Sequence, residues 1–116
     1  MVVDRDHDRR DDRLFHALAD RTRRDIVRRC VRGDHSVSAL ARGYPMSFAA
    51  VQKHVAVLET AGLVTKEKRG RERLVRTNVH ALRSAAYLLD EIEALWRERM
   101  DRFDATLHIT NERETT

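Results

Sequence analysis

The stretch that decides the fold is Tyr44–Gly62, with the sequence YPMSFAAVQKHVAVLETAG. Pro45 cannot continue a helix and predicts a turn, after which Ser47 supplies a helix start and Gly62 a helix end. The inward face of this predicted helix carries small apolar residues at helical spacing: Val51, Val55 and Leu58. Its early outward positions carry side chains of the types that touch base edges and phosphates: Ser47, Phe48, Gln52 and Lys53. The stretch therefore predicts a DNA-recognition helix.

A shorter helix is predicted just before this one. Ser36 is a suitable cap for a helix over Val37–Arg42, and Gly43–Met46 supplies the turn that follows it. Two helices joined by a short turn containing Gly and Pro, the second of them basic, are typical of a helix-turn-helix.

Two β-competent runs follow Gly62. They cover residues 63–68 and 73–78 and flank a charged tip that contains Gly70, which predicts a hairpin. A basic hairpin directly after a recognition helix is typical of a wing. The tip arginines, Arg69, Arg71 and Arg73, would lie along phosphates or enter the adjacent minor groove. The alternative is a solvated hairpin tip, and the neighbouring helix favours the wing.

The N-terminal part predicts two further helices. Residues 1–9 are strongly charged and are predicted to be a mobile tail. A first helix is expected over Arg10–Ala19, and a second over Thr22–Arg32, which is capped by Asp20 or Thr22 and ends at Gly33. The single cysteine, Cys30, falls on the buried face of the second helix. It is predicted to be a small core residue, because no second thiol exists to form a redox or metal pair.

The C-terminal part predicts one long helix over Val79–Ile109, followed by a loose tail at residues 110–116. Its apolar stripe is longer than a small winged core needs to cover, so we expect a second copy of the chain to bury it. The predicted dimer interface combines this stripe with the first helix: Leu14, Phe15, Leu18, Leu82, Ala85, Leu89, Ile92, Trp96, Met100 and Phe103.

The chain length and the predicted elements fit one small domain over residues 10–109. It is mainly α with a small β-hairpin, in the order α-α-α-α-β-β-α. The chain has 116 residues and a net charge of +4. Residues 47–78 hold seven basic against three acidic residues, so they carry this whole net charge, which favours a polyanion as partner. The polar start of the chain and its single cysteine predict a cytoplasmic protein, associated with the nucleoid if it binds DNA.

The residues from about Leu14 to Phe103 resemble the winged-helix transcriptional repressors of the ArsR/SmtB family. The motifs that carry the resemblance are ALAD-x-TRR at 17–24, S-x-x-A-V-x-K-H at 47–54, L-E-x-A-G-L-V at 58–64 and the wing GRER at 70–73. The resemblance implies a homodimeric repressor that binds an inverted repeat at a promoter, often its own. It also implies that Ser47, Gln52, Lys53 and His54 face the major groove.

The chain departs from this family before the second helix, on the recognition helix and at the positions of the known metal ligands. Arg21 stands where a proline is usual, Phe48 where glutamine is frequent and Gln52 where serine is frequent. Phe48 could contact a thymine methyl or tuck into the domain, and Gln52 could pair with adenine. Residues 36–42 contain no thiol and the last helix lacks the family's Asp-x-His pair, although it offers His80, Asp90, Glu93 and His108. We therefore expect no metal site and no cofactor.

Other functions stay open at this point. One alternative is a sensor of the same fold that uses Cys30 or a pocket at the dimer interface. Another is a basic module that binds an acidic protein or RNA. We expect no enzymatic activity, because the sequence has no Gly-rich phosphate loop, nucleophile elbow or metal-hydrolase motif. His54 also has no carboxylate one turn away, since position 50 is Ala50.

Overall fold

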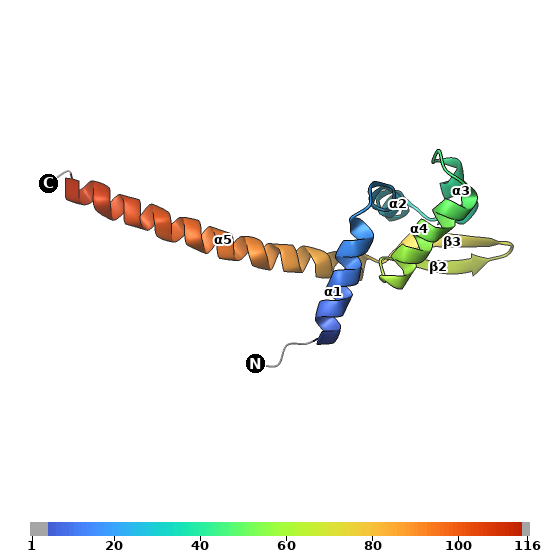
Figure 1. Cartoon of the computed structure of the whole chain (residues 1–116), viewed down its shortest axis with the longest axis horizontal. Coiled ribbons are helices and arrows are strands. Elements are labelled where there is room, and N and C mark those ends of the chain that lie inside the picture. Colours follow the sequence, from blue (N-terminus) through green and yellow to red (C-terminus); the bar gives the residue numbers. More distant parts are fainter. Residues whose placement is uncertain (1–4, 115–116) are drawn as a thin grey trace. The chain divides into compact units, whose positions relative to one another are not determined.

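The chain forms five helices and one small antiparallel sheet in the described residues, which are 5–114, with side chains described over 5–108. This computed structural model is drawn in Figure 1. The elements are α1 (Arg5–Leu18), α2 (Arg21–Arg32), β1 (His35–Ser36), α3 (Val37–Arg42), α4 (Phe48–Thr60), β2 (Val64–Arg69), β3 (Glu72–Thr77) and α5 (Val79–Glu114). The described residues up to Ala85 form one compact unit, the head, and those from Ala86 onward form a second, the arm. The predicted winged helix-turn-helix with a mainly helical fold is confirmed.

The head is organised around one apolar core. Every element before α5 except β1 contributes a fully or almost fully buried side chain. The helix faces predicted from apolar spacing pack inward, apart from Val31 at the edge of the apolar face of α2, which is 54% exposed. The buried residues are Leu14, Ala17, Ile26, Val27, Cys30, Leu40, Val51, Val55, Leu58, Leu63, Val64 and Val75. Burial of these side chains is the main force that holds α4 in place.

Capping side chains set the starts of three helices. Asp20 caps α2 by accepting a hydrogen bond from the Arg23 backbone N–H at 3.0 Å. Ser36 and Ser47 cap α3 and α4 in the same way, at 3.0 Å and 3.1 Å. At the other end of α4, Gly62 has a φ of +78°, which other residues rarely adopt. The Leu63 N–H then donates a hydrogen bond to the Leu58 carbonyl, which caps the end of the helix. The predicted limits of α4 are confirmed.

The sheet contains one strand that the sequence did not predict. Its order is β1-β3-β2, all antiparallel, with His35 opposite Val75 and Ser36 opposite Leu74. A strand of two residues is too short to show an alternating pattern, and Ser36 was recognised only as a helix cap. Because β1 pairs with β3, the root of the hairpin is fixed to the start of α3.

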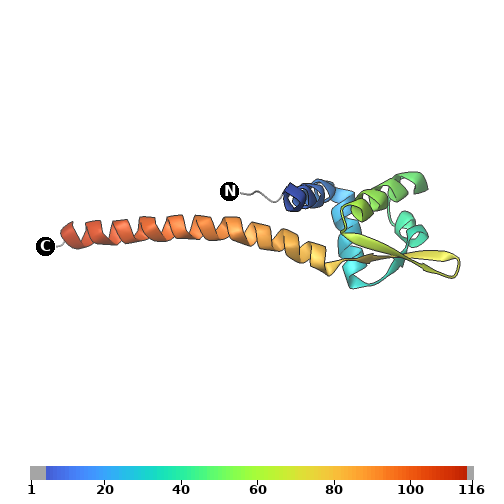
Figure 2. The same cartoon turned by 90° about the horizontal axis from the view of Figure 1, so that it is seen from below.

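The predicted hairpin is confirmed. Its turn is the two-residue loop Gly70–Arg71 between the paired residues Arg69 and Glu72. The φ of +60° at Gly70 fits a type II′ turn, which favours glycine at this position. The tip projects beyond α3 and α4 in both views (Figures 1 and 2).

Both ends of the helical region extend further than predicted. Helix α1 begins at Arg5 instead of Arg10, with Asp6 and Asp8 in its first turn, where the helix dipole favours negative charge. Helix α5 continues to Glu114, beyond the predicted end at Ile109. Residues 5–9 and 110–114 are therefore helical, and the remaining residues of the two predicted tails lie outside the described residues.

The end of α2 differs in detail from the prediction. The helix stops at Gly33 as expected, but that residue has an extended backbone with a φ of 176°. Any residue can adopt this conformation, so a left-handed glycine cap is not what ends the helix.

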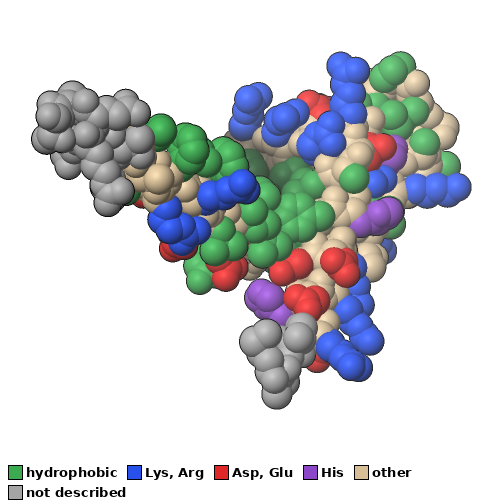
Figure 3. Space-filling model, turned by 60° about the vertical axis from the view of Figure 1, so that its left-hand side comes forward, with side chains coloured by type: hydrophobic (Ala, Val, Ile, Leu, Met, Phe, Trp, Pro, Cys, Tyr) green, Lys and Arg blue, Asp and Glu red, His purple; other side chains and the backbone are tan. Residues whose placement is uncertain are grey.

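The arm exposes apolar side chains along its described length. Leu89, Ile92, Leu95, Trp96 and Phe103 are all more than half exposed. Figure 3 shows hydrophobic side chains gathered along this helix, among acidic and basic ones. None of the helices in the described part of the chain is long and apolar enough to span a membrane.

Candidate nucleic-acid interface

The turn before α4 is fixed against α2. The Tyr44 hydroxyl donates a hydrogen bond of 2.5 Å to the Asp25 carboxylate, and the Arg29 guanidinium lies 5.4 Å from the centre of the Tyr44 ring. Burial, together with the Asp25 carboxylate, raises the pKa of Tyr44, so its hydroxyl keeps its proton at neutral pH. These contacts position the residue pair Pro45–Met46 and therefore the start of α4.

The outward side chains at the start of α4 are accessible. Phe48 is 47% exposed, so it does not tuck into the core. Gln52 and Lys53 are exposed one turn later. Ser47 is also exposed, but its hydroxyl oxygen caps the helix by accepting the Ala50 N–H. Ser47 can therefore offer a ligand only its hydroxyl proton and its remaining lone pair.

A groove joins the start of α4 to the wing. It has a volume of about 460 Å³ and receives side chains from the α3 start, from α4 and from both wing strands. The lining residues are Ser36, Val37, Ser38, Phe48, Gln52, Lys66, Arg71, Glu72 and Arg73. The tertiary structure thus brings together four of the predicted DNA-binding residues and adds Ser36, Ser38 and Lys66, which were not predicted.

The wing places like charges beside one another. Lys68 and Arg73 are directly opposite in the strand register, and they continue the face on which Val64, Val75 and Thr77 are buried. Like charges in directly opposed positions destabilise a strand pair, so this arrangement favours an anionic partner. Lys68 was not among the predicted site residues, although the period-two alternation of the hairpin places it on the same face as Arg73.

Two of the basic residues in this region are paired within the head. The Arg76 guanidinium makes two hydrogen bonds to Asp34, at 3.1 Å and 2.7 Å, and these bonds lower the pKa of Asp34. The Nζ atom of Lys66 lies 3.8 Å from Oε1 of Glu59. The other five make no ion pair within the described residues and are exposed: Lys53, Lys68, Arg69, Arg71 and Arg73. These five are the cations available to phosphates.

His54 has a different environment from its neighbours on α4. Its side chain is 22% exposed, and its Nδ1 lies 3.3 Å from a guanidinium nitrogen of Arg23 and 3.9 Å from Asp20 Oδ1. The sequence shows only that His54 has no carboxylate one turn away on its own helix. The carboxylate and the guanidinium come from the corner between α1 and α2.

The residues predicted for the dimer interface fall into three groups by exposure. Leu14 is 4% exposed and Ala85 is 5% exposed, so both are buried within their own chain and offer little surface to a partner. Phe15, Leu18, Leu82 and Met100 are half-buried. Leu89, Ile92, Trp96 and Phe103 are exposed and form the accessible part of the predicted interface.

Cys30 is buried in the core of the head. Burial raises the pKa of its thiol to about 11 despite the adjacent Arg29, so the reactive thiolate is scarce at neutral pH. Within the described residues, no group of three or more His, Cys, Asp or Glu side chains is arranged to hold a metal ion.

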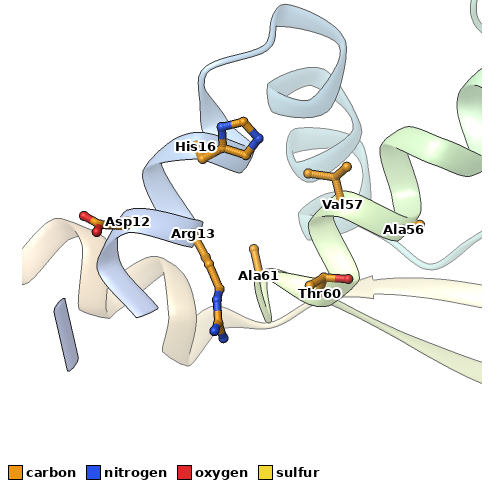
Figure 4. Close-up of a pocket in the computed structure, with 7 residues that line it drawn as sticks. All are labelled: Asp12, Arg13, His16, Ala56, Val57, Thr60 and Ala61. Atoms are coloured by element: carbon orange, nitrogen blue, oxygen red, sulfur yellow. The ribbon is translucent and has the colours of Figure 1, made fainter. Parts of the chain in front are cut away.

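A second hollow lies between α1 and the end of α4 (Figure 4). Its volume is about 520 Å³, and its walls are largely apolar. His16 projects from α1 toward Val57 of α4, whereas Asp12 points away from α4. The complete lining is Asp12, Arg13, His16, Ala56, Val57, Thr60 and Ala61. The hollow shares no residue with the groove beside the wing.

Comparisons with known proteins agree with this geometry. Residues 18–67 match a helix-turn-helix domain family. The chain is 40% identical over 85 residues to the HTH-type transcriptional regulator Rv2034 of Mycobacterium tuberculosis, covering 73% of this chain and 77% of that protein.

Two solved structures extend the comparison. An ArsR-like transcriptional regulator from Rhodococcus sp. RHA1 is 36% identical with a TM-score of 0.71, covering 81% of this chain and 89% of that one. The homodimeric winged helix-turn-helix DNA-binding domain Mb0332 from Mycobacterium bovis, a possible ArsR-family regulator, is 22% identical with a TM-score of 0.64. That match covers 80% of this chain and 89% of that one.

Proposed function

Because this chain belongs to the ArsR family of winged helix-turn-helix transcriptional regulators, we propose that it is a homodimeric repressor of its own promoter. The observation that supports this proposal is the groove in which α4 and the wing present base-reading and phosphate-binding side chains together. Each head would place the start of α4 in a major groove and the wing against the flanking backbone.

The two kinds of side chain have different roles in this proposal. Gln52 would form two hydrogen bonds to an adenine edge, and Phe48 would contact a thymine methyl, so these two residues read sequence. The five exposed cations would neutralise phosphates and supply affinity that does not depend on sequence. Arg76 has little part in binding, since Asp34 already holds its guanidinium.

The arm explains why we propose a dimer. A row of large apolar side chains that stays more than half exposed in one chain is typical of a protein–protein interface. A symmetric pair of chains would bury this row and present two α4 helices to successive major grooves, about 34–36 Å apart. The operator would then be an inverted repeat, and a dimer bound there would exclude RNA polymerase sterically.

A binding experiment on the DNA upstream of the protein's own coding sequence tests the proposal. Fluorescence anisotropy should show tighter binding to the operator than to a scrambled duplex by a factor of about 10³ or more at physiological salt. RNA of the same sequence is the comparison that addresses the alternative function. Equal affinity for operator and scrambled duplex, or a preference for RNA, would contradict the proposal.

The same assay tests the expected absence of a metal or redox signal. We expect operator binding to be unchanged by zinc, a chelator, an oxidant or a reductant, because the chain lacks the family's known metal ligands and Cys30 is buried. Release by zinc would identify a metal site, and release by oxidant alone would assign a role to Cys30.

A further inference from the structure

We propose that His54 does not read DNA but is a positioning residue that fixes the orientation of α4 against the corner between α1 and α2. The inference rests on the proposed function, in that α4 is taken to be the recognition helix. It changes the role of a residue that the sequence placed in the major groove. The structure places the imidazole beside Arg23, on a different side of α4 from the exposed Lys53.

Arg23 joins three elements of the head. Its Nε donates to the Ala17 carbonyl at 2.8 Å and another guanidinium nitrogen donates to the His16 carbonyl at 3.2 Å. Both carbonyls belong to the last turn of α1, where a cation is favoured, and the His16 carbonyl also accepts the Ala19 N–H at 3.2 Å. The third guanidinium nitrogen lies 3.3 Å from His54 Nδ1. One side chain of α2 therefore connects the end of α1 to the middle of α4.

The chemistry of this contact defines the form of the imidazole. A guanidinium can only donate hydrogen bonds, so Nδ1 must accept and the ring proton of neutral His54 must be on Nε2. The Asp20 carboxylate, 3.9 Å from the same nitrogen, also holds the start of α2 through the Arg23 N–H. That backbone hydrogen bond lowers the pKa of Asp20, so its charge is retained at neutral pH. Arg23 and Asp20 are the charged groups in contact with His54 among the described residues.

The contact between Arg23 and His54 gives α4 a directional constraint that its apolar core does not provide. Val51, Val55 and Leu58 bury the inner face of α4, and apolar contacts of this kind do not depend strongly on direction. A hydrogen bond does depend on direction. Small rotations of α4 would move Gln52 and Phe48 relative to the wing. We infer that the contact between Arg23 and His54 limits these rotations and keeps the two reading side chains in register with the wing cations.

The test compares variants of His54 and Arg23 in the full chain. His54→Leu removes the acceptor and should weaken operator binding about three- to tenfold, as expected for one lost hydrogen bond. His54→Asn can place an amide oxygen near the position of Nδ1 and should retain most of the affinity. Arg23→Lys should weaken binding like His54→Leu, and the two effects should not add, because both break one contact. Arg24→Lys is the matched control, since the Arg24 guanidinium bonds the Leu18 carbonyl of α1 at 2.8 Å.

Two readouts separate positioning from other roles. If His54 only positions α4, His54→Leu leaves the preferred base at every operator position and the salt dependence of binding unchanged. A changed preference at one base pair would show that His54 reads DNA, and unchanged affinity would show that the contact has no role. Either result overturns the proposal.

A measurement without DNA keeps the inference separate from the proposed function. In ¹⁵N-histidine NMR spectra of the wild type, the neutral form of His54 should carry its proton on Nε2, and Arg23→Lys should shift its Nδ1 resonance. A proton on Nδ1 would overturn the proposal even if His54→Leu failed to fold. If the wild type bound no DNA preferentially while Nδ1 still accepted from Arg23, the proposed function would fail and the geometry of the contact would stand.

Discussion

The head and the arm differ in how they are stabilised. The head buries its apolar side chains in its own core, whereas the arm leaves Leu89, Ile92, Trp96 and others more than half exposed. An amphipathic helix gains most of its stability from packing its apolar face. The head therefore contains the interactions that specify its fold, whereas the apolar face of the arm is exposed in the single chain.

The two regions also differ in charge. Up to Ala85 the sequence has 19 basic and 11 acidic residues, a net charge of +8, and from Ala86 it has 4 basic and 8 acidic residues, a net charge of −4. Residues 47–78 carry a net charge of +4, which equals that of the whole chain. The rest of the head carries another +4, and this is cancelled by the −4 of the arm. The attraction for a polyanion is confined to the head.

The largest effect is expected from adding charge to the arm. Leu89→Glu places a carboxylate in the exposed apolar row and should convert the proposed dimer to monomers. Operator affinity should then fall by about 10²–10⁴-fold, because the two heads would no longer bind together. Size-exclusion chromatography and anisotropy measure the two effects. Ala94→Glu adds the same charge on the opposite side of the helix and should change neither; an unchanged elution volume for Leu89→Glu would remove the arm from the interface.

The next largest effect is expected in the core of the head. Leu58 is fully buried, so Leu58→Ala should lower the free energy of unfolding by about 2–5 kcal/mol. Chemical denaturation at fixed protein concentration measures the change, with the exposed Thr60→Ala as control. A loss of under about 1 kcal/mol, with the same slope against denaturant, would mean that α4 is packed more loosely than the structure indicates.

A smaller, sequence-selective effect is expected at Gln52. Gln52→Ala should cost about 1–3 kcal/mol of binding at one base pair of each half-site and leave binding to scrambled DNA unchanged. Anisotropy with operators substituted one base pair at a time locates the position. If the base preferences of the variant matched those of the wild type throughout, α4 would be oriented differently on the DNA.

Lys53 should affect binding to all sequences alike. Lys53→Ala removes one phosphate contact, so the slope of log affinity against log salt should fall in magnitude by about 1 for operator and scrambled DNA. Titrations between low and moderate salt give the slope. A change that appeared only with the operator would show that Lys53 contacts a base, as proposed for its neighbour Gln52, and not a phosphate.

The smallest effect is expected at Cys30. Burial raises its pKa to about 11 from a usual 9.0, so the folded state holds the thiol proton more tightly than the unfolded chain does. This contribution to stability is present below pH 9 and is lost as the pH rises toward 11. Iodoacetamide at pH 8, followed by mass spectrometry, should label the native protein much more slowly than the denatured one. Equal labelling rates would show that the core of the head opens readily.

Local signals in the sequence were enough to predict most of the head. The caps at Asp20, Ser36 and Ser47 act within three residues, the turn at Gly70 needs only the conformational freedom of glycine, and the inward faces follow from apolar spacing. The exposure of Gln52 also follows from its place on α4. Each of these features depends on interactions within a few residues along the chain, so the order of residues determines them. The sequence left open whether Phe48 is exposed, and the structure decides that it is.

Other features were decided only by the tertiary structure. The contact between Arg23 and His54 spans 31 residues, the Arg76–Asp34 pair 42, and the bond from Thr77 to the Val27 carbonyl 50. Strand β1 exists because β3 lies beside it, and Leu14 is in the core because α2 and α4 pack around α1. Periodicity along the chain shows which face of a helix is apolar. Only the packing of the chain determines what that face meets, because partners distant in sequence meet only after the chain has folded.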